Sequence, residues 1–203
     1  FFHPWGIAID HDHDRILVVD FANNRVQSWS LSDQSLLSYI GHDAELYFPQ
    51  DVAIDKPHHR IIITDTDNDR LVFLSSIDLS FLFSVGSKRG SRPGEFNSPS
   101  SVAIDDDRHR IIVTDTNNHR VQVLSSIDGS FLFEFGSKGN QPGQLNNPEG
   151  VCIANHGRII VADFRNNRLQ SFTHEGHHIS SFDCGTENSW VAFDEHRGLI
   201  AFS

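Results

Sequence analysis

Short runs of apolar residues recur along the chain, and Asp, Asn, Gly or Pro residues bound each of them. The runs are rich in Val, Ile and Phe, which is typical of β-strands, and no window keeps the apolar period of a helix. Four runs follow one another, and then the same series starts again with a proline. The first runs of the four series are residues 4–10, 49–55, 99–105 and 148–154. The sequence therefore predicts an all-β protein built from an internal repeat.

The length of the repeat indicates how its strands are arranged. The opening prolines, Pro4, Pro49, Pro99 and Pro148, are 45, 50 and 49 residues apart, a period typical of a β-propeller blade. Four strands per period predict one four-stranded antiparallel sheet per blade. The nearly all-apolar first run is expected near the central channel, and the alternating fourth run at the outer edge. We therefore expect one domain over 1–203, with blades at 4–40, 49–85, 99–135 and 148–183 and a partial fifth blade at 189–203.

The third repeat carries a resemblance to a known family. It contains Ala-Ile-Asp at 103–105, Thr-Asp-Thr-Asn-Asn-His-Arg at 114–120 and Phe-Gly-Ser-Lys-Gly-Asn-Gln-Pro-Gly-Gln-Leu-Asn-Asn-Pro at 135–148. This plan resembles the NHL repeat, and the resemblance covers essentially the whole chain. The linkers at 40–46 and 182–188 depart from it, since they are shorter and lack the second Gly. The resemblance implies a fold more than a function, because propellers host binding, scaffolding and catalysis alike.

The family usually closes its ring with six blades, and about four and a half NHL-type blades do not complete a circle. We therefore expect the chain to be a piece of a longer protein with a six-bladed ring. In isolation, its open sheet edges are expected to drive self-association.

Charge and composition exclude several classes of partner. The formal net charge of −11 at pH 7 disfavours broad binding to nucleic acid or to anionic membranes. No apolar run approaches the roughly 18 residues of a membrane span, so we expect no membrane association. The two cysteines, Cys152 and Cys184, give no disulfide framework, which favours a reducing compartment and a cytoplasmic location.

The hairpins of a propeller blade divide between its two faces. The first and third hairpins share one face, and the second hairpin shares the other face with the linker. The first face is predicted to be acidic and rich in histidine, with segments 10–14, 56–59, 105–109 and 174–178. The second face gathers Arg, Lys and Asn residues, and a basic patch is expected there over the second to fourth blades.

The run Asp10-His11-Asp12-His13-Asp14 is the sharpest candidate for a metal site. Its alternating ligands splay apart in a tight turn, and no Gly or closing Glu follows at the spacing of a calcium loop, so a solvated hairpin is favoured.

A catalytic zinc site is a second possibility, suggested by analogy with a related propeller. A lyase that completes peptide amidation has a similar propeller and holds zinc with three histidines just past the second strands. The corresponding residues here are Asn24, Asp69, His119 and Asn167, and a single histidine does not support that site. We therefore expect no metal, no cofactor and no catalytic residue, with a metal-dependent lyase or hydrolase as an alternative.

An Asp and an Arg recur five positions apart once per blade, at the turn between the second and third strands. A catalytic group is needed only once, so this recurrence indicates a structural role. The carboxylate is expected to accept turn amide hydrogens and to pair with the Arg that starts the next strand. The pairs are Asp20 with Arg25, Asp65 with Arg70, Asp115 with Arg120 and Asp163 with Arg168.

Two binding functions remain. In the tripartite-motif ubiquitin ligases, whose propeller this chain resembles, the NHL domain recruits substrates, and any ligase activity would lie in domains absent from this chain. Some of those propellers bind single-stranded RNA through an electropositive face, which is the second hypothesis. The net charge places a protein partner ahead of RNA.

The candidate partner-binding residues lie on the second face. They are Arg89, Arg92, Asn117, Asn118, His119, Arg120, Phe164 and Arg165. Phe21 and Trp5 are candidate surfaces for base stacking, which RNA recognition commonly uses. Packing between blades is the simpler interpretation of Phe21 and Phe164, since both replace a Thr of the other repeats.

Overall fold

The computed structural model describes residues 1–40, 44–186, 189–194 and 199–202. It contains four antiparallel sheets of four strands, here called blades 1 to 4, and one two-stranded sheet, here called the fifth sheet. Blade 1 is β1 (Pro4–Asp10), β2 (Arg15–Asp20), β3 (Arg25–Ser30) and β4 (Leu36–Ile40). Blade 2 is β5 (Pro49–Asp55), β6 (Arg60–Asp65), β7 (Arg70–Ser75) and β8 (Phe81–Val85). Blade 3 is β9 (Pro99–Asp105), β10 (Arg110–Asp115), β11 (Arg120–Ser125) and β12 (Phe131–Phe135). Blade 4 is β13 (Pro148–Ala154), β14 (Arg158–Asp163), β15 (Arg168–Phe172) and β16 (His178–Asp183). The fifth sheet is β17 (Val191–Asp194) and β18 (Leu199–Phe202).

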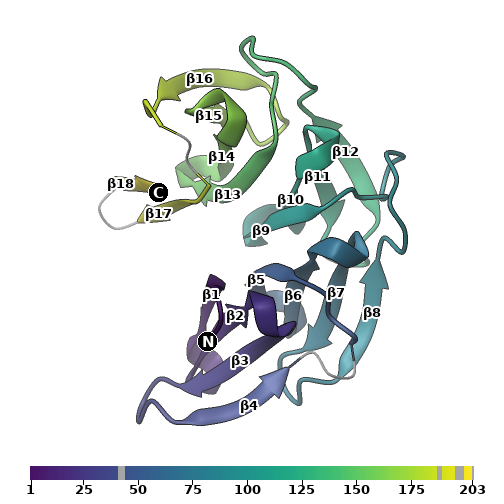
Figure 1. Ribbon diagram of the computed structural model, residues 1–203, viewed down its shortest axis with the longest axis vertical. Helices are drawn as coiled ribbons and strands as arrows, with labels where there is room; N and C mark the ends of the chain where they lie inside the picture. The colour runs from purple at the N-terminus through teal and green to yellow at the C-terminus, as the bar shows by residue number, and fades with distance from the viewer. Residues whose placement is uncertain (41–43, 187–188, 195–198, 203) are drawn as a thin grey trace.

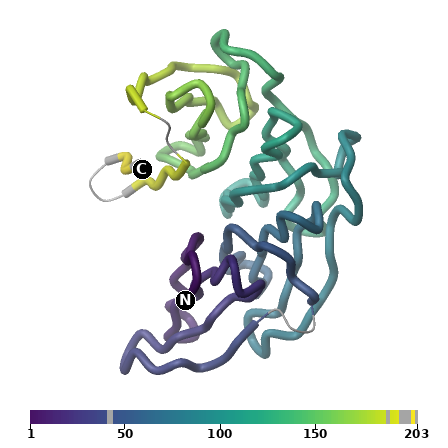
Figure 2. Tube along the Cα trace, in the orientation of Figure 1, coloured from purple at the N-terminus to yellow at the C-terminus, as the bar shows by residue number. Residues whose placement is uncertain are grey.

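The sheets follow one another along an arc (Figure 1). β1, β5, β9 and β13 lie innermost, and β4, β8, β12 and β16 lie outermost, as the apolar and alternating patterns predict. The arc is open between blade 1 and the fifth sheet, and both ends of the trace lie beside this opening (Figure 2). Trp5 and Trp190 approach each other edge to face here, with ring centroids 5.8 Å apart.

The core consists of apolar side chains packed between neighbouring blades. Burying an Ile, Leu or Phe side chain contributes about 1.5–3 kcal/mol, so each interface has many such contributions. Between blades 1 and 2 the buried residues include Leu17, Val26, Val52, Ile61 and Ile63. One further apolar residue from each linker is buried beside the blades, namely Leu46, Phe96 and Leu145.

The hairpins joining the first three strands of each blade contain one turn of 3₁₀ helix. The second hairpins hold η2 (Phe21–Asn23), η4 (Thr66–Asn68), η6 (Thr116–Asn118) and η8 (Phe164–Asn166). The first hairpins hold η1 (His11–His13), η3 (Lys56–His58), η5 (Asp106–Arg108) and η7 (Asn155–Gly157). The residue after each second-hairpin turn is left-handed, with φ of 53°, 52°, 56° and 54° at Asn24, Asp69, His119 and Asn167. Asn, Asp and His tolerate this backbone better than most residues.

The predicted four-stranded antiparallel blades and the inner and outer placement of their strands are confirmed. The predicted sharing of faces is also confirmed, since Arg15 of the first hairpin bonds the third-hairpin carbonyl of Ser76, and Asn118 of the second hairpin bonds the linker carbonyl of Gly90. Among the described residues, no helix is long and apolar enough to cross a membrane.

Candidate interaction face

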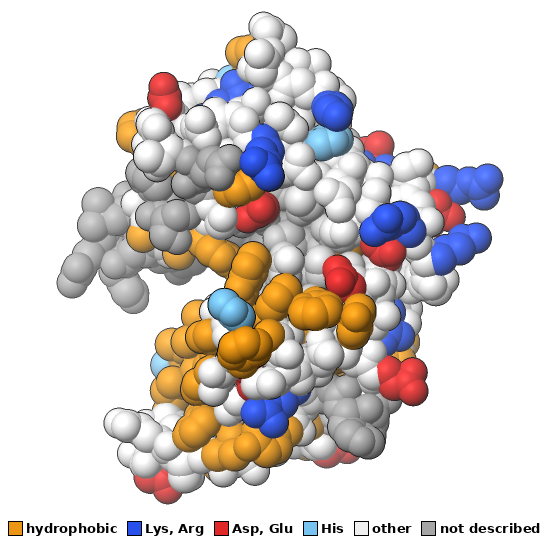
Figure 3. Space-filling model, in the orientation of Figure 1, with side chains coloured by type: hydrophobic (Ala, Val, Ile, Leu, Met, Phe, Trp, Pro, Cys, Tyr) orange, Lys and Arg blue, Asp and Glu red, His pale blue; other side chains and the backbone are white. Residues whose placement is uncertain are grey.

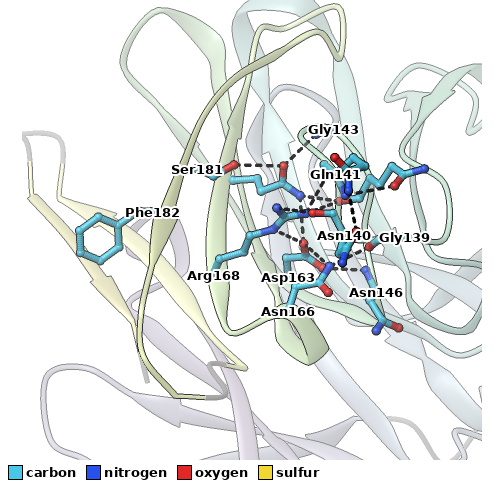
Figure 4. Close-up of polar contacts among 12 residues, drawn as sticks. Gly139, Asn140, Gln141, Gly143, Asn146, Asp163, Asn166, Arg168, Ser181 and Phe182 are labelled. Atoms are coloured by element: carbon cyan, nitrogen blue, oxygen red, sulfur yellow. Dashed lines mark hydrogen bonds and ion pairs between the residues drawn. The ribbon is translucent and has the colours of Figure 1, made fainter.

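The second hairpins and the linkers form one face of the arc, here called the linker face. In each blade an aspartate at the end of the second strand organises it. In blade 4, Asp163 accepts hydrogen bonds from the Asn146 backbone N–H at 2.6 Å, Asn166 Nδ2 at 2.9 Å and Arg168 Nε at 2.8 Å (Figure 4). Gln170 Nε2 donates a fourth bond at 2.9 Å. The Asp–Arg ion pair recurs in the other blades at 2.9, 2.7 and 2.8 Å, as Asp20–Arg25, Asp65–Arg70 and Asp115–Arg120.

The arginine of each pair also binds the preceding linker, where one is described. Arg168 donates to the carbonyls of Asn140, Gln141 and Gln144 at 2.9, 3.1 and 2.9 Å. Arg120 donates to the carbonyls of Ser91, Arg92 and Glu95 at 2.8, 3.2 and 2.9 Å. These guanidinium groups therefore fix the linkers and present little free charge to a ligand.

The environment of the central aspartate changes along the arc. Burial raises the pKa of Asp65 and Asp115, although hydrogen bonds from neighbouring groups oppose the shift. At Asp20, burial also acts to raise the pKa, but the donors Phe2 N–H, Asn23, Arg25 and Gln27 outweigh it and lower the pKa. The aspartates are thus enclosed and ion-paired structural groups.

In blades 1 to 3, the left-handed residue after the second hairpin connects two successive blades. Asn24 Oδ1 accepts a hydrogen bond from Phe48 N–H at 2.8 Å, and Asp69 Oδ1 accepts one from Ser98 N–H at 2.8 Å. His119 Nδ1 accepts one from Asn147 N–H at 3.1 Å. Three residue types therefore form the same bridge, here called the interblade latch. Burial, and secondarily the charge of Lys138, lowers the pKa of His119, which suits an imidazole that accepts a hydrogen bond at an unprotonated Nδ1.

The eight candidate partner-binding residues divide into two groups. Asn118, His119 and Arg120 are occupied by the contacts that fix linkers and blades: Asn118 Nδ2, for example, donates to Asp115 Oδ2 at 2.9 Å and to the Gly90 carbonyl at 2.7 Å. The remaining five lie at or near the surface: Arg89, Arg92, Asn117, Phe164 and Arg165.

The surface members of this set have different neighbours. The side chain of Arg89 is 69% exposed, and its Nε lies 3.6 Å from Asp69 Oδ2. Asn117 Nδ2 donates to Ser98 Oγ at 2.8 Å, and its Oδ1 accepts from Asn147 Nδ2 at 3.2 Å. The Arg165 guanidinium lies 4.9 Å from the centroid of the Phe164 ring, a cation–π contact.

The opposite face has a second series of ion pairs that the sequence interpretation missed. Arg15 donates to Asp10 Oδ2 from Nε at 2.9 Å and from Nη2 at 2.7 Å, and Arg60 contacts Asp55 in the same way. Each arginine also reaches a third-hairpin carbonyl of the next blade, at Ser76 and Ser126 respectively. We call these contacts with the carbonyls of the next blade the forward clasps. The spacing of five between Asp and Arg could have revealed the ion pairs within each hairpin.

The prediction of a solvated hairpin at residues 10–14 is therefore wrong for Asp10, which is buried. Asp10 is 1% exposed, and it binds His13 Nδ1 at 2.9 Å as well as Arg15. Because this carboxylate neutralises a buried guanidinium, it belongs to the fold. Among the residues that the structure describes, no three His, Cys, Asp or Glu side chains are grouped so as to hold a metal ion.

The innermost strands surround a hollow of about 720 Å³ with mainly apolar walls. Asp51 is a buried carboxyl in this wall: its Oδ2 accepts bonds from Ser101 Oγ at 2.7 Å and Val102 N–H at 3.0 Å, and its Oδ1 accepts one from Val52 N–H at 2.8 Å. Burial raises the pKa of Asp51 to about 6. Cys152 also lines the hollow, and burial raises the pKa of its thiol to about 12, so it is a weak nucleophile.

Comparison with known proteins supports the repeat assignment. The model of the NHL repeat matches residues 1–28, 96–124 and 145–172. A segment of 43 residues is 46% identical to protein lin-41 of Caenorhabditis elegans, and this match covers 21% of the chain and 4% of lin-41. The chain thus corresponds to a small part of that relative.

Solved structures resemble the chain in fold. Hydrazine synthase of Kuenenia stuttgartiensis matches with a TM-score of 0.75 at 11% identity, covering 98% of this chain and 55% of that one. A chain of a nidogen/laminin complex matches with a TM-score of 0.68 at 16% identity, covering 89% of this chain and 63% of that one. At these identities the likeness shows the fold alone. Taken with the blade geometry, the matches show that the chain folds as the blades of a β-propeller and carries NHL repeats at residues 1–28, 96–124 and 145–172.

Proposed function

We propose that the chain is a non-catalytic interaction module that recruits a protein partner through the linker face. The observation that carries this proposal is the use of the repeated arginines: Arg70, Arg120 and Arg168 bind linker carbonyls and carboxylates. Within the part of the chain that the structure describes, the repeated arginines of this face therefore do not form a regular row of free cations that would bind a phosphate backbone. Residues that reach its surface, such as Arg89, Arg92, Asn117, Phe164 and Arg165, are the proposed contacts.

The proposal extends to the protein that contains the module. NHL propellers point to interaction modules, and the local similarity to lin-41 supports a substrate-recruiting role within a larger, tripartite-motif-type ubiquitin ligase. On this proposal the ligase chemistry belongs to another domain, and the module acts in the cytoplasm. Both cysteines are free in the structure, which agrees with a reducing compartment.

Binding of single-stranded RNA is the second candidate. The pair of Phe164 and Arg165 favours it, because an aromatic ring beside a cation suits an unstacked base. The net charge of −11 weighs against it. The metal-dependent lyase or hydrolase has no specific observation in its favour.

The test compares the chain with a variant in which Arg89, Arg92, Asn117, Phe164 and Arg165 are all replaced by Ser. Proximity labelling in cells should give a set of proteins that the variant loses. Filter binding of a random 20-nucleotide single-stranded RNA pool at 0.15 M salt should be weaker than about 10⁻⁵ M, in the range of non-specific binding. Tight RNA binding that the variant abolishes, with an unchanged set of labelled proteins, would reverse the order of the two candidates.

A further inference from the structure

An aromatic row crosses the linker face over blade 1 and the start of blade 2. It consists of Tyr47, Phe48, Phe21 and Trp5, and successive ring centroids lie 4.8, 4.9 and 5.2 Å apart. Tyr47 is 48% exposed and Trp5 is 36% exposed. Figure 3 shows hydrophobic side chains gathered in a band on this face, with acidic side chains beside it.

Blades 2 and 3 have polar residues at the positions of the row. Phe21 corresponds to Thr66 and Thr116, whose hydroxyls donate to the carbonyls of Pro99 and Pro148 at 2.8 and 2.7 Å. A phenylalanine cannot make that bond between blades. The hydrogen bond that blades 2 and 3 make at this position therefore does not explain the aromatic ring at residue 21.

Phe48 departs from the plan in the same direction. Its φ is 47°, in the left-handed region, where a bulky side chain is unfavourable. The corresponding residues of the next two blades are Ser98 and Asn147, with φ of 55° and 50°. A strained, partly exposed aromatic residue at a position that accepts Ser or Asn points to a binding role.

An equivalent ring in blade 4 contacts a guanidinium group of the same chain. In blade 4 the residue equivalent to Phe21 is Phe164, and the guanidinium of the following residue, Arg165, lies over its ring. In blade 1 the following residue is Ala22. Across the described ranges, 1–40, 44–186, 189–194 and 199–202, no arginine or lysine is found over a ring of the row, although Arg25 lies 4.1 Å from the Tyr39 ring nearby.

Carboxylates lie at the Tyr47 end of the row. Asp67 N–H donates to the Tyr47 carbonyl at 3.2 Å, and the negative charge of Asp69 acts on Asp67. Arg89 is the cation beside them, 3.6 Å from Asp69, and its side chain is largely exposed. The Tyr47 end of the row is thus acidic on balance, which suits a cationic ligand and repels a polyanion.

Resting on the proposed function, we infer that the aromatic row binds an extended peptide segment that bears arginine. Its guanidinium groups stack on Phe21 and Trp5 as Arg165 does on Phe164, and a further arginine pairs with Asp67. The row accommodates on the order of five residues of extended chain, at about 3.3 Å per residue.

The test uses a variant that gives the row the residues of blade 2 or 3. Trp5→Gln, Phe21→Thr, Tyr47→Asn and Phe48→Ser are combined, since Gln50, Thr66, Asn97 and Ser98 occupy these positions elsewhere. The probe is a displayed library of random 12-residue peptides, selected on the 203-residue chain, with the selected peptides then synthesised for fluorescence anisotropy. Selected peptides should be enriched in arginine and should bind the combined variant at least tenfold more weakly.

Three single variants sharpen the result without depending on the folding of the combined one. Ala22→Arg should place an internal guanidinium over Phe21 and weaken peptide binding at least fivefold. Asp67→Asn should weaken it about threefold and reduce its salt dependence. Tyr39→Ser removes an exposed aromatic residue outside the row and should leave binding unchanged.

The outcomes separate this inference from the proposed function. Selection of no peptide, or peptides without arginine or lysine enrichment, overturns the inference, as does equal binding to the wild type and the combined variant. Partners that proximity labelling still finds would then leave the interaction module intact with another contact surface. If a random 12-nucleotide RNA pool binds more tightly than the peptides and loses binding in the combined variant, the row is a base-stacking surface and both proposals fail.

Discussion

The imidazole Nδ1 of His119 accepts a hydrogen bond from the backbone N–H of Asn147, which is 28 residues further along the chain. The bond joins the second hairpin of blade 3 to the start of blade 4. Asn24 and Asp69 make the same latch two blades and one blade earlier, so the position requires an acceptor and not a histidine.

Substitution of His119 by Asn should therefore preserve stability at pH 7.5, while His119→Ala should reduce it by about 1 kcal/mol, the net value of one hydrogen bond. The pKa of His119 is lowered in the folded protein, so the unfolded chain binds the proton more readily below pH 6.5. The wild type should accordingly lose more stability than His119→Asn as the pH falls from 7 to 5. Urea unfolding of both proteins at each pH measures this difference; parallel pH profiles would show that His119 is not the latch.

Substitution of Arg120 should reduce stability more than substitution of most other residues of the linker face. Its side chain is 7% exposed, and it bonds Asp115, Glu134 and the linker carbonyls. Arg120→Ala leaves Asp115 buried without its cation, which should reduce the free energy of unfolding by about 3–5 kcal/mol. Arg92→Ala, at an exposed position of the same linker, is the matched control and should change it by less than about 0.5 kcal/mol. Similar effects of the two substitutions in denaturant unfolding would show that the linker is not held by Arg120.

Gly6 marks a close approach of two inner strands. A Cβ at this position would lie 2.4 Å from Asp51 Oδ1, 2.6 Å from Asp51 Cα and 2.8 Å from the Gln50 carbonyl oxygen. Gly6→Ala should therefore destabilise the protein by about 2–3 kcal/mol, because backbone atoms must move. Adding Asp51→Ser should not rescue it, since Cα of residue 51 remains in place. Gly94→Ala meets no atom within 4 Å and has φ of +76°, so it should cost only about 1 kcal/mol; thermal unfolding ranks the three variants.

Asp51 should make stability depend on pH in the direction opposite to His119. Its pKa is about 6 in the folded protein against the ordinary aspartate pKa of 3.8, so the folded state holds the proton more tightly. The contribution of Asp51 to the free energy of unfolding is complete below about pH 4. It declines by up to about 3 kcal/mol as the pH rises to 6. Asp51→Ser, which copies Ser101 of blade 3, should remove the decline. The difference between wild-type and variant unfolding free energies from pH 4 to 7 isolates the group, and a constant difference would contradict its burial as a titrating carboxyl.

Much of the fold was predictable because the relevant interactions are local. The strands of each blade follow from apolar runs between turn residues, and the Asp115–Arg120 pair follows from a spacing of five across one hairpin. The Asp10–Arg15 pair has the same spacing, but the charged and histidine-rich turn between the two residues suggested a solvated loop.

Contacts between blades were less predictable. The latch of His119 and the arginine contacts with linkers join segments more than 20 residues apart, and their existence depends on how closely two sheets pack. Burial of Asp51 likewise follows from the approach of β1, β5 and β9 and not from its neighbours in sequence. The aromatic row was recognised only in Trp5 and Phe21, because Tyr47 and Phe48 lie in a linker whose path the sequence does not define.

The forward clasps give the molecule a direction of assembly. Arg15 and Arg60 find their aspartate partners within their own hairpins, but their carbonyl partners, at Ser76 and Ser126, lie 61 and 66 residues later. On a ribosome that adds about 5–20 residues per second, each blade would wait several seconds for the next to supply that acceptor. Arg15 and Arg60 thus pair with an aspartate as soon as their own hairpins form, but each gains its second acceptor only when the following blade has been made.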